Sequence, residues 1–273
     1  MTQLTLVTGN NQKNTINEFK SPDYPGLKSS LCTLYLNPTK QFLFYGIAYN
    51  GVFHYLKKIH WETDYETIIK NEFDANSSFM EVLSLSFEED TTLIPNSFTG
   101  TNKKKLNHYM PGANKKNTHT TALNATVHSI YTEQTEWLSA ILKIFPESKV
   151  TNSFSPFINT PVKTEYKVIV NTSIQKTQLV LLRNNSILLC EQYTTPNETE
   201  SLYFILNVLK VNNIEDQSRC TLLLCCESNE QKMNSTVSEY FENIILPSDN
   251  VNIHGFPLSK QDKIDYLYIL SAQ

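Results

Sequence analysis

The same order of apolar runs occurs twice in this 273-residue chain. The first copy has three strand-like runs, "LCTLYLN", "QFLFYGIAY" and "VFHYLKKIHW", then a helical "DYETIIKNEF" and a strand-like "FMEVLSLSF". The second copy has "YKVIVNT", "TQLVLLR" and "SILLCEQY", then a helical "ETESLYFILNVLK" and a strand-like "CTLLLCC". An internal repeat constrains the fold strongly, because each copy must form the same supersecondary unit. We therefore predict a structural duplication.

A single numerical offset relates the two copies. Asn50-Gly51 and Asn184-Asn185 each separate two strand-like runs and accept the positive φ angles of a tight hairpin turn. Aligning the two turns gives an offset of 184 − 50 = 134. Further pairs at this offset are Asn37 with Asn171, Gln41 with Gln175, and the expected helix starts Asp64 with Glu198. The register thus holds without a gap from the first strand to the helix, in which Asp64 is the expected N-cap.

The chain length favours two domains, because domains commonly hold about 100 to 200 residues. We expect a flexible N-terminal arm over residues 1–29, a first domain over 30–162 and a second over 163–273. The arm is polar and turn-rich, with no sustained hydrophobic period. The boundary falls near Thr160–Thr164, where "INTPVKT" interrupts the pattern.

Segments outside the two copies give further expectations. "TTALNATVHSIYT" (120–132) alternates like one strand, and "EQTEWLSAILKIFPES" (133–148) is typical of a helix. The apolar stripe of that helix is a core face or a dimer face, and consists of Trp137, Ile141, Leu142 and Phe145. "NEQKMNSTVSEYFENIIL" (229–246) predicts a helix and "NVNIHGF" (250–256) a strand. The final "IDYLYILSA" (264–272) fits either a helix or a strand.

The repeated hairpins, the "TLIPNSF" segment (Thr92–Phe98) and the "YFILNVL" helix (Tyr203–Leu209) together resemble one family. On these features the chain is similar to domain-of-unknown-function family 3822 from about Leu31 onward. That family looks like an actin-fold family without an assigned activity. The resemblance implies an α/β protein with mixed sheets and a duplicated actin-like (ribonuclease H-like) fold. Each of its two domains would hold a three-strand meander, a helix and a further strand.

The resemblance also identifies two joins where active actin-like proteins carry Asp-x-Gly between the first two strands of each domain. The Asp holds Mg²⁺ through water, and the Gly lets backbone amides approach phosphates. Here the joins are "NPTKQ" and "NTSIQKT", in which Asn37 and Asn171 lack the charge. Thr39 and Ser173 place side chains where close approach is needed, and Pro38 has no amide hydrogen. We interpret these as degenerate phosphate-loop positions and expect no nucleotide or other cofactor.

Other candidate sites are weaker. Glu88, Glu89 and Asp90 form an acidic loop in which a metal ion is less expected than solvated carboxylates. His54 and His60 lie six residues apart, about 20 Å along a strand, too far to share a metal ion. The adjacent Cys225 and Cys226 should point to opposite faces of a strand. We expect no metal site here and identify no catalytic residue.

Charge argues against nucleic-acid binding. The net charge is −4, and only Arg183 and Arg219 among the 23 basic residues are arginine, so bidentate phosphate recognition has few donors. The lysine-rich loop, Lys103–Lys116, is interpreted as solvated. No apolar run approaches the roughly 20 residues that cross a bilayer. We expect a cytoplasmic protein with no membrane insertion and five reduced cysteines.

Two functional hypotheses follow. The first is a non-catalytic interaction or scaffold protein that has lost nucleotide binding and binds a peptide, a protein partner or a second copy of itself. The alternative is an ATP-binding actin-like enzyme or switch, in which the residues at the two joins replace the usual phosphate-binding groups and the acidic loop supplies metal binding.

Overall fold

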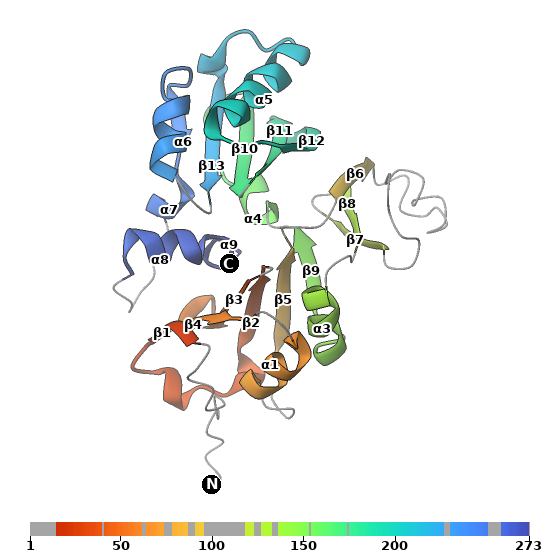
Figure 1. The fold of residues 1–273 in the computed structure, drawn as a ribbon, viewed down its shortest axis with the longest axis vertical. Coiled ribbons are helices and arrows are strands. Elements are labelled where there is room, and N and C mark those ends of the chain that lie inside the picture. The colour runs from red at the N-terminus through yellow and green to blue at the C-terminus, as the bar shows by residue number, and fades with distance from the viewer. Residues whose placement is uncertain are drawn as a thin grey trace.

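The computed structural model describes residues 15–39, 41–61, 64–73, 78–86, 91–95, 118–122, 127–132, 136–152, 154–173, 175–226, 230–250 and 258–272. Two mixed sheets lie one above the other, each with helices on its outer face and with short helical segments between the two sheets (Figure 1). The chain is a mixed α/β protein with a duplicated, two-sheet fold.

The first sheet has strand order β1-β4-β3-β2-β5-β9. Its strands are β1 (Thr15–Lys20), β2 (Thr33–Pro38), β3 (Phe42–Tyr49), β4 (Val52–His60), β5 (Glu81–Ser86) and β9 (Lys149–Asn152). Neighbours β2, β5 and β9 run parallel, whereas the other pairs are antiparallel. Helices α1 (Tyr65–Glu72) and α3 (Glu136–Ile144) pack on the outer face. The stripe of α3 is therefore part of the core, as one of the two sequence interpretations proposed.

The second sheet has strand order β12-β11-β10-β13-β14. Its strands are β10 (Tyr166–Ser173), β11 (Lys176–Arg183), β12 (Ser186–Thr194), β13 (Cys220–Cys226) and β14 (Asn243–Ile245). Helices α5 (Glu198–Val211) and α6 (Glu230–Val237) cover its outer face, and a short η5 (Gln217–Arg219) precedes β13. As in the first sheet, strand one of the meander pairs parallel with the strand after the helix.

The predicted duplication is visible in detail. Asn50 and Gly51 have φ angles of 49° and 74°, and Asn184 and Asn185 have φ angles of 49° and 64°, as tight hairpin turns require. Each hairpin also carries one β-bulge, between Ile47/Ala48 in the first copy and Leu181/Leu182 in the second. These positions differ by 181 − 47 = 134, the offset found in the sequence.

The predicted pairing of helix starts is wrong by one residue. Asp64 caps α1, since its side chain accepts a hydrogen bond from the Thr67 amide. The N-cap of α5 is Asn197, whose side chain accepts from the Glu200 amide, so the caps differ by 197 − 64 = 133. Side-chain capping thus starts both helices, but the second connection is one residue shorter.

Residues 15–29 do not form the loose arm that the sequence suggested. Strand β1 pairs antiparallel with β4 at the edge of the first sheet. Two short 3-10 turns follow, η1 (Tyr24–Gly26) and η2 (Ser29–Leu31), and the buried Tyr24 ring stacks on Tyr55 at 4.6 Å. Aromatic packing and strand pairing hold this polar segment to the sheet.

Three other expectations also change. Residues 120–132 are not one strand, because β7 (Thr118–Ala122) and β8 (Val127–Thr132) pair antiparallel in a small sheet with β6 (Thr91–Pro95). The helix expected over 229–246 ends at Val237, and β14 occupies 243–245. The strand expected over 250–256 lies outside the described residues, apart from Asn250, which ends α7 (Pro247–Asn250).

The space between the two sheets holds the C-terminal segment. "IDYLYILSA" is helical, in the end of α8 (Lys260–Asp265) and in α9 (Leu267–Ser271). Together with α4 (Ser155–Ile158), α9 packs against the inner faces of both sheets and forms one core with them, which we call the shared core. Figure 1 shows α9 and the C-terminus between the sheets. In the described part of the chain, no helix is long and apolar enough to cross a membrane.

Candidate functional site

The two asparagines predicted at the phosphate-loop positions lie near the ends of equivalent strands. Asn37 is on β2 and Asn171 is on β10. Residues two positions apart on a strand point to the same face, and Tyr35 and Ile169, two positions earlier, belong to the shared core. Both asparagines therefore point toward that core. Asn37 is 3% exposed and Asn171 is 1% exposed. A ligand therefore reaches neither side chain unless the packing between the sheets opens.

The two asparagines differ in their hydrogen bonds. The Tyr268 hydroxyl, from α9, donates to Asn171 Oδ1 in the buried interior. Asn37 Oδ1 has no hydrogen-bond partner among the described residues. The C-terminal helix thus contacts the second join through a specific bond, whereas the first join has no equivalent bond to its amide oxygen.

Thr39 closes the first join internally. Its amide donates to the Phe42 carbonyl at 2.8 Å, and its hydroxyl donates to the same carbonyl at 3.1 Å. The Phe42 amide donates back to the Thr39 hydroxyl at 3.0 Å, and the Trp61 indole donates to the Thr39 carbonyl at 2.8 Å. At the second join, Ser173 is paired with Lys176 across the β10–β11 hairpin. The polar groups of Thr39 are therefore used within the fold.

The segment α8–α9 is fixed to the first sheet by both charge and packing. Asp265 forms an ion pair with Lys58 of β4 at 2.6 Å, and Asn17 of β1 donates to Asp262 at 3.2 Å. A Cβ atom placed on Gly46 would lie 3.0 Å from Ile269 and 2.7 Å from Phe53, so β3 approaches α9 through a residue without a side chain. This arrangement was not predicted from the sequence.

These residues do not fit a Mg²⁺–nucleotide. Such a ligand needs carboxylates beside the metal and accessible backbone amides for the phosphates. The described residues of the joins offer buried amide side chains, and the Thr39 amide is already bonded.

This chain matches known proteins both in sequence and in fold. The sequence profile of a family described as proteins of unknown function (DUF3822) matches residues 31–244. The chain belongs to the DUF3822 family. Its fold is similar to that of a Bacteroides thetaiotaomicron VPI-5482 protein with an actin-like ATPase fold and unknown function, at 15% identity and a TM-score of 0.68. That alignment covers 90% of this chain and 98% of the other.

A second similar structure is the PilM-PilN type IV pilus biogenesis complex, at 11% identity and a TM-score of 0.58. It aligns over 88% of this chain and 96% of the other. No curated protein matches the sequence. At these identities the structural likeness establishes the actin-like fold and not an activity.

The remaining sequence candidates in this DUF3822 chain have structural roles or lie outside the described residues. His54 Nδ1 is 2.9 Å from the Ser21 hydroxyl, and the His60 ring lies 5.4 Å from that of Phe42. Cys225 packs in the shared core and Cys226 in the outer core of the second half, so they face opposite ways as predicted. In the described residues no group of three potential ligands could hold a metal ion. Residues 88–90 and 103–116 lie outside them.

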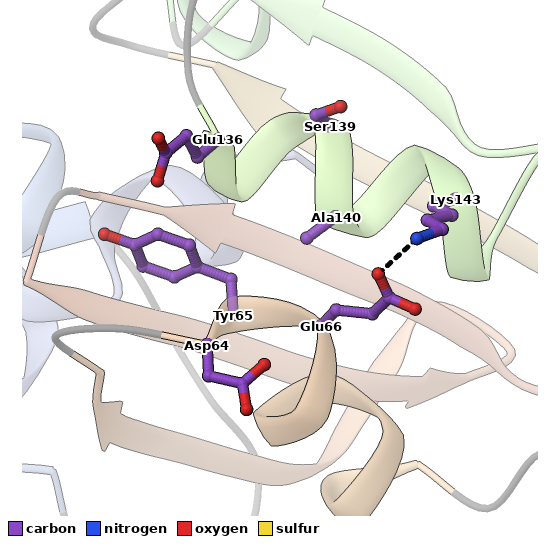
Figure 2. Close-up of a pocket in the computed structure, with 7 residues that line it drawn as sticks. All are labelled: Asp64, Tyr65, Glu66, Glu136, Ser139, Ala140 and Lys143. Carbon is purple, nitrogen blue, oxygen red and sulfur yellow. Dashed lines mark hydrogen bonds and ion pairs between the residues drawn. The ribbon is translucent and has the colours of Figure 1, made fainter.

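A groove between α1 and α3 on the DUF3822 chain is lined by Asp64, Tyr65, Glu66, Glu136, Ser139, Ala140 and Lys143. Figure 2 shows Tyr65 and Glu66 of α1 opposite Glu136 and Lys143 of α3. Glu66 binds both Lys143 and Lys70 at 2.5 Å. These two lysines, Lys143 first, hold the pKa of Glu66 below its usual value. The charge of Glu66 is already matched, and we assign no ligand to this groove.

The segment that joins the two halves is held by the second sheet. Lys167, which is 2% exposed, donates to the Ile158 carbonyl and, at 2.9 Å, to the Thr160 carbonyl. Both arginines of the chain form ion pairs with Glu165, that of Arg183 at 2.8 Å. Arg219 is the main cause of the lowered pKa of Glu165. The arginines therefore fix the start of β10.

Proposed function

We propose that this chain is a non-catalytic protein-interaction or scaffold protein whose actin-like fold has lost nucleotide binding. One observation carries the proposal: the C-terminal helix α9 packs between the sheets and bonds the residue that stands at the second phosphate-loop position. Asn37, Thr39, Asn171 and Ser173 are then structural positions, with no part in catalysis or cofactor binding.

The burial of α9 supports this proposal. All four residues from Leu267 to Leu270 are buried, and their neighbours come from both sheets. Removing these side chains from the core would expose apolar surface at a cost of roughly 1.5 to 3 kcal/mol for each large side chain. A ligand that needs the space of α9 would have to compensate that cost.

One protein of similar fold occurs in a complex with another protein. The PilM-PilN structure is, by its name, a complex in type IV pilus biogenesis, and it shares the actin-like fold of this chain. We extend from it only the class of function, binding to another protein. With five cysteines free in the structure, we also propose a reducing, cytoplasmic site of action.

Thermal unfolding with and without millimolar ATP and Mg²⁺ tests the loss of nucleotide binding. A ligand at 100 times its dissociation constant stabilises a protein by about 2.7 kcal/mol, which shifts the unfolding temperature visibly. We expect no shift. A shift that is lost in Asn37→Ala and Asn171→Ala, but retained in the surface control Tyr203→Ala, would establish the ATP-binding alternative instead.

Light scattering after size exclusion, combined with affinity capture, tests the interaction role. We expect either self-association or a specific partner that elutes with the chain. A strict monomer that retains no partner would contradict the proposal, whatever the outcome with ATP.

A further inference from the structure

The third strand of the meander is paired on its outer edge in the first half but not, among the described strands, in the second half. In the first half, β4 has β3 on one side and β1 on the other. In the second half, β12 has β11 on one side, and no described strand pairs with its other edge. Because the two meanders share one register, β1 shows what an additional strand looks like on this unit.

Strand β1 pairs with β4 from Thr15 to Lys20, with one register shift between Thr15 and Asn17, and the contact continues to the bulge of β4. The register runs from Thr15 opposite Ile59 to Lys20 opposite Tyr55. The bulged residue is His54, whose carbonyl accepts from the Ser21 amide at 2.9 Å and whose ring contacts the Ser21 hydroxyl. A bulge therefore does not prevent an extended segment from binding this edge.

The equivalent edge in the second half is unpaired among the described strands, and five of the nine residues of β12 are apolar. Leu188 is the bulged residue of β12, at 54 + 134 = 188, and it is 49% exposed. Natural edge strands are commonly protected by charged residues, especially lysine, or by proline. The nine residues of β12, "SILLCEQYT", contain no lysine or proline, and their one charged residue is Glu191. Strand β6 comes within 8 Å of β12 but belongs to a separate sheet.

We propose that the free edge of β12 binds an extended segment of a partner protein as an added antiparallel strand. The proposal rests on the interaction role proposed above and assigns that role a surface. Main-chain hydrogen bonds would supply affinity, and alternate side chains would supply specificity.

The register of β1 predicts the chemistry of the partner segment. Glu18 of β1 lies opposite Lys57, and the position equivalent to Lys57 is the exposed Glu191, at 57 + 134 = 191. The partner residue opposite Glu191 should therefore be basic. Phe19 lies opposite Leu56, whose equivalent is Cys190, a partly buried residue beside the shared core. The next partner residue should be apolar.

A peptide from this chain provides the probe. We would compare "TINEFKS", residues 15–21, with the same peptide carrying Glu18→Lys, and follow backbone amide resonances of the full chain. We expect the lysine peptide to shift resonances of β12 and to bind about fivefold more tightly than the unchanged peptide, because opposite charges face each other across the strands. In the chain variant Glu191→Lys, which changes an exposed residue, this preference should reverse.

Three results would overturn the proposal. One is a peptide preference that Glu191→Lys leaves unchanged. Another is slow hydrogen exchange at all β12 amides in the free monomer, which would mean that another part of the chain covers the edge. The last is a dimer in which β12 is protected, which would make a second copy the occupant. None of these depends on ATP binding, so this proposal and the loss of nucleotide binding fail separately.

Discussion

The two halves share one strand and helix order, but different residues pack between the sheet and its first helix, α1 in the first half and α5 in the second. In the first half, the buried Lys57 and Glu72 form an ion pair at 2.5 Å, and the Tyr45 hydroxyl also donates to Glu72. Burial first, and then Tyr55 and Glu72, raise the pKa of Tyr45 well above its ordinary value, so the hydroxyl keeps its proton. The residues at the equivalent places in the second half are Leu179, Leu189, Glu191 and Ile205.

The equivalence of Glu72 and Ile205 follows from the helix caps, since 72 − 64 = 8 and 205 − 197 = 8. One unit thus buries a charged pair where the other buries an aliphatic side chain. Turns and bulges recur at the common offset of 134 and the helix caps one residue away from it, but the buried chemistry does not recur. The fold therefore depends on local backbone geometry and apolar register, and it tolerates different interiors.

Glu72→Ile, which copies the second half into the first, is expected to be the most damaging of the changes considered. It leaves the buried Lys57 without its carboxylate, and removing one partner of a buried ion pair costs about 3 to 5 kcal/mol. Urea unfolding measures the loss of stability.

The double variant Lys57→Met/Glu72→Ile is the control. Removing both charges should recover about 2 kcal/mol of that loss, because no unpaired charge remains in the core. Equal destabilisation of the single and double variants would show that packing, and not charge, sets the difference between the halves.

Gly46 and Val180 make a second matched pair, since 180 − 46 = 134. Gly46→Val copies the second half again, but here the added side chain meets Phe53, Ile269 and Leu56 within 3.0 Å. We expect a loss of about 1 to 3 kcal/mol, as for other overpacked cores. A lower unfolding temperature checks this, and unchanged stability would mean that α9 does not press on β3.

The hydroxyls of Tyr268 in α9 and of its N-cap Tyr266 differ in their hydrogen bonds. Tyr268→Phe removes the donor to the buried Asn171 Oδ1, which should cost about 1 to 2 kcal/mol. The matched control is Tyr266→Phe, because the buried Tyr266 hydroxyl has no hydrogen-bond partner among the described residues. That control should be neutral or slightly stabilising. If both variants lose equal stability in urea, the bond to Asn171 contributes nothing specific.

The parts predicted well from the sequence are those with local causes. Asn50-Gly51 and Asp64 act through their own backbone geometry and side chains, so their roles were evident before the fold. The duplication followed for the same reason, since matched turns fixed the register. The fold class was implied by this duplication together with the resemblance to the DUF3822 family.

The parts that the sequence missed depend on contacts between distant segments. Strand β1 lacks alternation of apolar residues, and Ile16 and Phe19 are three positions apart. It is a strand because β4 provides an edge. The end of the chain is apolar on all sides, since it packs between two sheets, and a segment buried all round shows no period that separates helix from strand. The contact of Tyr268 with Asn171, 97 residues away in sequence, has no local signal.

The smallest predicted effect concerns Lys167, whose equivalent in the first half is Thr33, at 167 − 134 = 33. Burial lowers the pKa of Lys167 from 10.5 to about 8. Between these two values the unfolded chain binds a proton that the folded chain has released, so stability rises as the pH increases through 8. From pH 7 to pH 9 the gain from this group is about 1 kcal/mol.

Lys167→Met should remove this gain while keeping a side chain of similar length in place. The measurement is the difference in urea unfolding free energy between pH 9 and pH 7, in the wild type and in the variant. Since other titrating groups contribute equally to both proteins, the change in that difference belongs to Lys167. An identical pH dependence in both would mean that the ammonium is solvated in the folded state. The carbonyls of Ile158 and Thr160 would then not hold it, and the join between the halves would be looser than its hydrogen bonds indicate.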